Sequence, residues 1–292
     1  MTQSAVFSGA LTVRLELLKL RIVLMVMLTV GVGFALAGPP EVLSPALLNA
    51  LVGTALVAAG AGALNQFLER DVDALMRRTA HRPLPSGRLR AAEARAIGVA
   101  ASVGGVVYLA ATVNLVTAAV AAFTVASYVL VYTPLKRVTS LSTLVGAVPG
   151  ALPIVGGWAA GGGALGLEVW VLFWIVFFWQ LPHFLALSWI YREDYARAGL
   201  ETLSVGDTDG RRTFRQAALY AAALVPVSLA PAVLGMAGSF YFVGAALLSG
   251  CFAAATAWAG RERTPARARR LFVASLVYLP GILVLMVTNR LP

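Results

Sequence analysis

A short acidic stretch, NQFLERDVD at 65–73, directly follows the apolar run LVGTALVAAGAGAL. Residues four apart in a helix lie about 40° apart around its axis. Asn65, Glu69 and Asp73 therefore form one column of oxygen-bearing side chains about 12 Å long, and Asp71 points elsewhere. Carboxylates four residues apart repel each other, and a divalent cation would reverse that penalty. Mg²⁺ is the expected cation, because proteins usually hold it with one or two carboxylates plus substrate phosphates.

A different interpretation of the same acids is a solvated helix end, where they would pair with Arg70, Arg77 and Arg78. Carboxylates placed in or beside a membrane are expensive to keep, which makes a functional role the stronger hypothesis. Both interpretations are open at this point.

Basic residues follow the acids closely. Arg78 and Arg82 stand four apart in MRRTAHRPLPSGRL, and Lys136 with Arg137 occurs in YTPLKRVT. Guanidinium groups match the geometry of phosphate oxygens. A second acidic pair, Glu193 and Asp194, occurs in SWIYREDYARAGLETL. Two acidic and two basic clusters would suit a diphosphate held by Mg²⁺ and cationic side chains.

The elements that must position these residues are membrane helices. The 292 residues are 59% hydrophobic and only 12% charged, whereas soluble domains carry about 25% charged residues. The long apolar runs predict an all-α polytopic membrane protein. A single cysteine, Cys251, excludes an internal disulfide framework. Nine spans are expected, at about 22–38, 45–64, 91–112, 115–131, 141–161, 169–190, 216–236, 240–259 and 271–289.

The charges support that topology. With nine spans, 22 of the 23 Lys and Arg residues fall on one side of the membrane, and only Arg290 falls on the other. The positive-inside rule then predicts a cytoplasmic N-terminus and an outside C-terminus. The basic excess is a topology signal, which excludes nucleic acid as the expected partner. Eleven of the 13 acids share the cytoplasmic side, so we expect a multi-pass protein of the inner (cytoplasmic) membrane with its active face there. No linker divides residues 1–292, which predicts one integral-membrane domain.

Three stretches carry a resemblance to a known family. The chain resembles the UbiA-type intramembrane prenyltransferases, and within them the protohaem IX farnesyltransferases (haem O synthases). The resemblance covers about half of the chain, and its stretches are NQFLERDVDALMRRTAHRPLPSG at 65–87, YTPLKRVTSLSTLVGAVPGALPIVGGW at 132–158 and WQLPHFLALSWIYREDYARAGLETL at 179–203. Ser142 and Ile154 depart from the family pattern, at positions that affect loop packing more than the acids.

The resemblance implies roles for individual residues. The catalytic residues would be Asn65, Glu69, Asp73, Asp194 and Lys136. The metal ligands would be Asn65, Glu69, Asp71, Asp73, Glu193 and Asp194, with Asp71 the weakest candidate. The diphosphate would contact Arg78, Arg82, Lys136 and Arg137.

The resemblance also implies an activity. Farnesyl diphosphate would donate its farnesyl group to the vinyl group of haem B, a substrate rather than a prosthetic group, with Mg²⁺ as cofactor and the lipid bilayer as surroundings. A haem A synthase is a possible partner. Alternatives are a prenyltransferase acting on a quinone precursor or a chlorophyll-type acceptor, and a transporter. A transporter should place ionisable residues at the bilayer midplane, whereas these acids cluster at one face.

His183 and Tyr132 are the candidates for haem contact. His183 lies mid-membrane in WQLPHFLALSW and could ligate haem iron or hold a propionate. The alternative is a polar residue hydrogen-bonded between helices. For Tyr132, which ends a span on the cytoplasmic side, the alternative is an interfacial aromatic belt.

Overall fold

The computed structural model describes residues 12–39 and 41–291. Helices make up most of this part, and its only β interaction is an isolated bridge between Ala237 and Arg290. In chain order the helices are α2 (Leu20–Leu36), α3 (Pro45–Leu75), α4 (Ala91–Thr112), α5 (Leu115–Ala126), the π-helix η1 (Ser127–Tyr132), α6 (Thr133–Leu135), α7 (Ser142–Ala160), α8 (Leu167–Ile190), α9 (Arg192–Arg197), α10 (Arg211–Val233), α11 (Ser239–Glu262) and α12 (Pro265–Thr288).

Eight helical segments of the described part are long and apolar enough to cross a membrane, with α5, η1 and α6 together forming one of them. They match eight of the nine expected spans in order and position. The first expected span corresponds to α2, whose 17 residues fall just short of that length. The total of nine spans and the orientation of the termini stay predictions.

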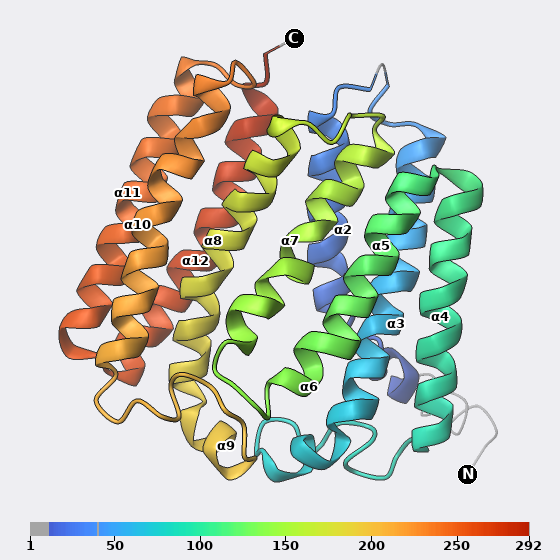
Figure 1. Ribbon diagram of the computed structural model, residues 1–292, viewed down its shortest axis with the longest axis vertical. Helices are drawn as coiled ribbons and strands as arrows, with labels where there is room; N and C mark the ends of the chain where they lie inside the picture. The colour runs from blue at the N-terminus through green and yellow to red at the C-terminus, as the bar shows by residue number, and fades with distance from the viewer. Residues whose placement is uncertain (1–11, 40, 292) are drawn as a thin grey trace.

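The long, charged connections between helices lie together at one end of the bundle. In Figure 1 the helices stand side by side, and the connections α3–α4, α6–α7 and α8–α9–α10 all lie at the lower end. These are the long, charged connections of the sequence. The alternation expected from the basic residues therefore has a counterpart in the arrangement of the helices.

Helix α3 is longer than the expected span 45–64. Ser44 caps its start by accepting a hydrogen bond from the backbone N–H of Leu47 (3.4 Å), and Pro45 occupies the first turn, where it needs no donor. No Gly or Pro interrupts the sequence after Asn65, and the helix continues to Leu75. The acidic stretch is therefore helical throughout.

Helix α7 lies in the interior of the bundle, where small residues allow close contact with α2. A Cβ atom at Gly157 would lie 2.0 Å from the backbone oxygen of Val30, and one at Gly33 would lie 2.2 Å from that of Ile154. Larger residues at either position would force the helices apart. Close backbone contact through small residues is the usual way in which membrane helices associate.

The π-helix η1 ends beside the charged end of the bundle. Pro134 has no N–H to donate to the preceding turn, and at this point the backbone N–H of Thr133 bonds to the carbonyl of Tyr128, five residues back. Widened turns of this kind occur frequently at functional sites. Here the segment places Tyr128 and Tyr132 with ring centroids 5.4 Å apart, and Lys136 follows directly after α6.

Candidate active site

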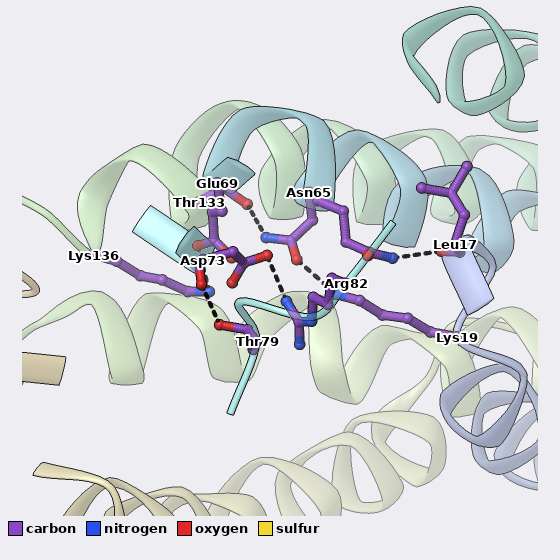
Figure 2. A network of polar contacts seen from close by, with 10 residues as sticks. Leu17, Lys19, Asn65, Glu69, Asp73, Thr79, Arg82, Thr133 and Lys136 are labelled. Carbon is purple, nitrogen blue, oxygen red and sulfur yellow. Dashed lines mark hydrogen bonds and ion pairs between the residues drawn. The ribbon is translucent and has the colours of Figure 1, made fainter. Parts of the chain in front are cut away.

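The acidic column of α3 is buried at the lower end of the bundle. Asn65, Glu69 and Asp73 are 1%, 7% and 1% exposed. Figure 2 shows all three beside side chains from other parts of the chain. Asp71 is exposed, and its carboxylate lies 3.7 Å from the guanidinium of its neighbour Arg70. The helix therefore separates Asp71 from the other three, as the spacing predicts.

Each member of the column has a basic partner from a different segment (Figure 2). The Lys136 Nζ lies 2.7 Å from Glu69 Oε1, and the Arg82 Nη1 lies 2.7 Å from Asp73 Oδ2. Lys19 donates to the Asn65 Oδ1 at 2.8 Å. The three cations come from the start of α2, the α3–α4 connection and the end of α6, so the column joins three separate segments.

The two lysines differ in their electrostatic surroundings. Burial, reinforced by the nearby charge of Arg82, lowers the pKa of Lys19, which precedes α2, to about 7. Burial also acts on Lys136, but the adjacent Tyr132 and Glu69 outweigh it and raise its pKa above the ordinary value. Lys136 has a carboxylate at contact distance whereas Lys19 has only an amide, which explains the opposite directions.

One carboxylate oxygen of the column is left without a partner. Asp73 Oδ1 is enclosed and makes no hydrogen bond with any described residue. Buried carboxylate oxygens are rarely left so, because the desolvation cost is high. The described residues contain no cluster of three or more His, Cys, Asp or Glu side chains able to hold a metal by themselves. The donor set therefore fits a cation such as Mg²⁺ only if a substrate supplies further oxygens.

The column opens into a cavity of about 410 Å³. Its charged end includes Lys136, Arg82 and Arg78 in addition to the column. Its other end is apolar and extends along α3 as far as Thr54, about 28 Å from Asp73 by helical rise. The apolar walls come from α2, α5 and α7 and include Val23, Val26, Val30, Val120, Ala121, Pro153 and Gly156. The polarity of the cavity lining is therefore complementary to a ligand with a charged head and a hydrocarbon tail.

The cavity gathers seven of the predicted site residues, namely Asn65, Glu69, Asp73, Arg78, Arg82, Tyr132 and Lys136. Four other predicted residues, Asp71, Arg137, Glu193 and Asp194, are not among its lining, and neither is His183. Three of these, Asp71, Arg137 and Glu193, are exposed side chains.

Asp194 is buried against the α3–α4 connection (residues 76–90, called the arginine loop below) and is not among the residues that line the cavity. Its Oδ2 accepts from the backbone N–H of Arg78 (3.3 Å) and its Oδ1 from Arg197 (2.8 Å). Desolvation opposes ionisation, but these hydrogen bonds prevail and hold the pKa of Asp194 below its ordinary value. The guanidinium of Arg78 lies over the ring of Tyr191, 5.1 Å from its centroid. In this arrangement Asp194 positions Arg78, and direct metal binding by Glu193 and Asp194 stays a prediction.

His183 faces α12. Its Nδ1 lies 2.7 Å from Ser275 Oγ, and its ring stacks on Phe272 and Trp179. The Ser275 hydroxyl also donates to the carbonyl of Phe272 (2.5 Å), so this contact links His183 to the backbone of α12. These contacts favour the alternative expectation, a polar residue bonded between two helices.

The sequence interpretation missed several lining residues. Lys19 was counted only as a topology charge, although its position just before an apolar run already placed it at the membrane boundary. The structure adds its left-handed backbone conformation, φ 51°, which is uncommon for a residue other than glycine. Tyr128, Tyr195 and Thr202 also line the cavity, and no sequence pattern distinguished them.

Comparison with known proteins agrees with this geometry. The model of the UbiA prenyltransferase family matches residues 26–279. The chain belongs to the UbiA prenyltransferase family. It is 48% identical over 285 residues to the Protoheme IX farnesyltransferase of Solibacter usitatus, covering 94% of this chain and 98% of that protein. It is 44% identical over 275 residues to the protein of the same name from Salinibacter ruber, covering 94% and 97%. The family resemblance is confirmed.

Solved structures share the fold. A UbiA homologue from Archaeoglobus fulgidus, bound to GPP and Mg²⁺, superposes with a TM-score of 0.67 at 17% identity over 94% of this chain and 99% of that one. A digeranylgeranylglyceryl phosphate synthase superposes with a TM-score of 0.79 at 17% identity over 96% and 98%. The expected all-α membrane bundle of UbiA type is confirmed.

The position of Asp194 yields a prediction about the arginine loop of this UbiA family member. Asp194→Asn removes the anionic acceptor of the Arg78 N–H and of Arg197. Because a hydrogen bond to a charged group contributes about 1.5–3 kcal/mol, the loop should open roughly tenfold more often. Limited trypsin digestion of the protein in detergent should show faster cleavage after Arg77 or Arg78.

The matched control is Glu193→Gln, which changes the exposed neighbouring carboxylate and should leave the cleavage rate as in the wild type. Equal cleavage rates in the Asp194→Asn variant and the control would contradict the positioning role of Asp194.

Proposed function

We propose that the protein transfers the farnesyl group of farnesyl diphosphate to a vinyl group of haem B, giving haem O and diphosphate. The observation that carries the proposal is a cavity lined by basic side chains at one end and by apolar side chains at the other. The names of the relatives, Protoheme IX farnesyltransferase, supply the acceptor. In the reaction the C–O bond to diphosphate breaks, the farnesyl carbon bonds to one vinyl carbon, and water adds its oxygen to the other and loses a proton.

The basic residues of the cavity would act on the leaving group. Lys136, Arg82 and Arg78 line its charged end and are already fixed, by Glu69, Asp73 and the Tyr191 ring respectively. Cations that are held in place before the reaction stabilise the negative charge that develops on a departing diphosphate. We infer that these three side chains bind the diphosphate. Arg137 is not among the residues that line the cavity, so contact between Arg137 and the diphosphate has less support.

The acidic column would hold Mg²⁺ through Asn65, Glu69 and Asp73, because Asp73 Oδ1 is buried and unpaired among the described residues. When bound, Mg²⁺ neutralises diphosphate charge and favours departure of the leaving group. The chain's own contribution is to keep the column rigid: Lys19, Arg82 and Lys136 fix its side chains, and Thr79 donates to the Asp73 carbonyl at 2.9 Å. Asp71 is exposed and would be dispensable.

The apolar part of the cavity would receive the farnesyl tail. It would also keep water away from the allylic carbocation that forms when diphosphate leaves. Tyr132 stands where the two parts meet, with the Lys136 Nζ 4.5 Å from its ring centroid. We place Tyr132 among the acceptor contacts. His183 contacts α12 and would reach a haem only from outside this cavity.

The side of the membrane on which the reaction would take place can be inferred from the arrangement of the helix connections. The connections α3–α4, α6–α7 and α8–α9–α10 lie at one end of the bundle (Figure 1), and Arg78 and Arg82 of the first of them line the charged end of the cavity, which supports a cytoplasmic active face in the inner membrane. A single domain spanning residues 1–292 and delivery of the product to a haem A synthase are further parts of the proposal.

The acceptor is tested directly. The purified protein, incubated with haem B, farnesyl diphosphate and Mg²⁺, should yield a haem whose mass corresponds to addition of farnesyl and water. Mass spectrometry of the extracted haem is the measurement. Parallel reactions contain a quinone precursor or a chlorophyll-type tetrapyrrole in place of haem B. Prenylation of either of these, without any haem product, would defeat the haem assignment.

The column is tested by two neighbouring acids. Asp73→Asn removes a charge from the buried column and should lower kcat for farnesyl transfer at least a hundredfold. Asp71→Asn removes the same charge two residues away, outside the cavity, and should stay within about twofold of the wild type because exposed ion pairs contribute little. Product formation under saturating substrate is the measurement. Similar losses in both variants would refute the assignment of the column.

A further inference from the structure

A second pocket lies beside the charged end of the cavity. It has a volume of about 550 Å³ and is lined by Glu16, Lys19, Gln66, His81, Arg82, Pro83, Ser86 and Arg88. We call it the vestibule. Apart from Pro83 every lining residue is polar or charged, and the side chains of Glu16, His81, Ser86 and Arg88 are exposed. Nothing in this lining would accommodate a hydrocarbon tail.

The vestibule and the cavity share two residues, Lys19 and Arg82. Lys19 bonds to Asn65 and Arg82 to Asp73, so both cations belong to the charged end of the cavity. Both also line the vestibule. An anion released at the acidic column would therefore meet two residues that also line the vestibule.

A buried amide adds to the polar lining of the vestibule. Gln66 is 1% exposed and donates from its Nε2 to the carbonyl of Leu17 at 2.6 Å. Its Oε1 is enclosed and has no partner among the described residues. The amide therefore ties this part of the vestibule lining to the N-terminal segment.

The vestibule lining carries a third basic residue, Arg88. Arg88 Nη2 lies 2.7 Å from Glu16 Oε2 and donates to the His81 carbonyl at 2.6 Å. Its Nε donates to Ser86 Oγ at 3.1 Å. Lys19, Arg82 and Arg88 thus line the same pocket, in which Glu16 is the only carboxylate, while Arg82 is also paired with Asp73 of the cavity.

We propose that the vestibule is a binding site for inorganic diphosphate, through which the product leaves toward the cytoplasm. The site rests on the proposed function in one respect, since prenyl transfer from a prenyl diphosphate generates this anion. Lys19 and Arg82 pass the diphosphate from the cavity, and Arg88 receives it. The polar lining selects the free anion over a prenyl diphosphate, whose tail belongs in the cavity.

The Glu16–Arg88 pair distinguishes an anion site from a structural strut. If the pair only ties the N-terminal segment to the α3–α4 connection, removal of either charge weakens the same contact and both variants change in the same direction. If the vestibule binds an anion, Arg88→Gln removes attraction whereas Glu16→Gln removes repulsion and frees Arg88. The two variants then change diphosphate affinity in opposite directions.

The experiment is calorimetric titration of the full-length protein, in nanodiscs with Mg²⁺, with inorganic diphosphate. A saturating unreactive thiolo analogue of farnesyl diphosphate occupies the cavity and Arg82 first, so that the remaining binding reports on the part of the vestibule around Arg88. The wild type should bind one diphosphate. Arg88→Gln should weaken this binding about tenfold, and Glu16→Gln should tighten it several-fold. Both differences should shrink in high salt because the site is open to solvent.

The matched control is the Arg14–Glu93 pair, which also ties the N-terminal segment to the rest of the protein, at 2.8 Å, but does not line the vestibule. Arg14→Gln and Glu93→Gln should bind diphosphate as the wild type does. Absence of residual binding in the wild type, or weakening in both Glu16→Gln and Arg88→Gln, would overturn the proposal. The titration contains no acceptor, so failure of haem farnesylation would refute the proposed function without affecting this result.

Discussion

The structure depends on the need of two buried carboxylates for counter-charges. Glu69 and Asp73 sit almost fully buried at the end of a membrane helix, where an unpaired charge would be strongly destabilising. Lys136 and Arg82 meet that need from two different connections. The same contacts that stabilise the acids therefore fix the cations around one end of the cavity. A binding site for an anionic head group follows from the requirement to neutralise the helix end.

The charged and polar groups of the column are not all paired with one another, and the unpaired positions suit a metal ion and a diphosphate. Asp73 Oδ1 has no partner in the described part of the chain, and Lys19 bonds to the neutral amide of Asn65 and forms no ion pair with a described carboxylate. One position thus lacks a cationic partner and another lacks an anionic one, within a single column. A metal–diphosphate pair would satisfy both. The apolar walls that begin next to this column would suit the hydrocarbon tail of the proposed prenyl diphosphate.

The sequence predicted what periodicity and composition determine. The helical column of Asn65, Glu69 and Asp73, and the separation of Asp71 from it, follow from the spacing of four residues along α3. The spans follow from apolar runs, and the helix that carries the acidic column continues beyond the expected span 45–64 to Leu75. Contacts between distant segments were beyond this reasoning: Lys19 meets Asn65 across 46 positions and Asp194 meets Arg78 across 116. His183 was expected to face a ligand, and its bond to Ser275 likewise depends on how α8 and α12 pack.

The central claim is that one cavity binds the charged head at the acidic column and the tail along α3. The most direct test is an experimental structure of the protein with Mg²⁺ and the unreactive thiolo analogue of farnesyl diphosphate. The account predicts a cation on Asp73, the diphosphate in contact with Lys136 and Arg82, and the tail between α2, α5 and α7. A diphosphate bound away from these residues, or a tail outside the cavity, would contradict it.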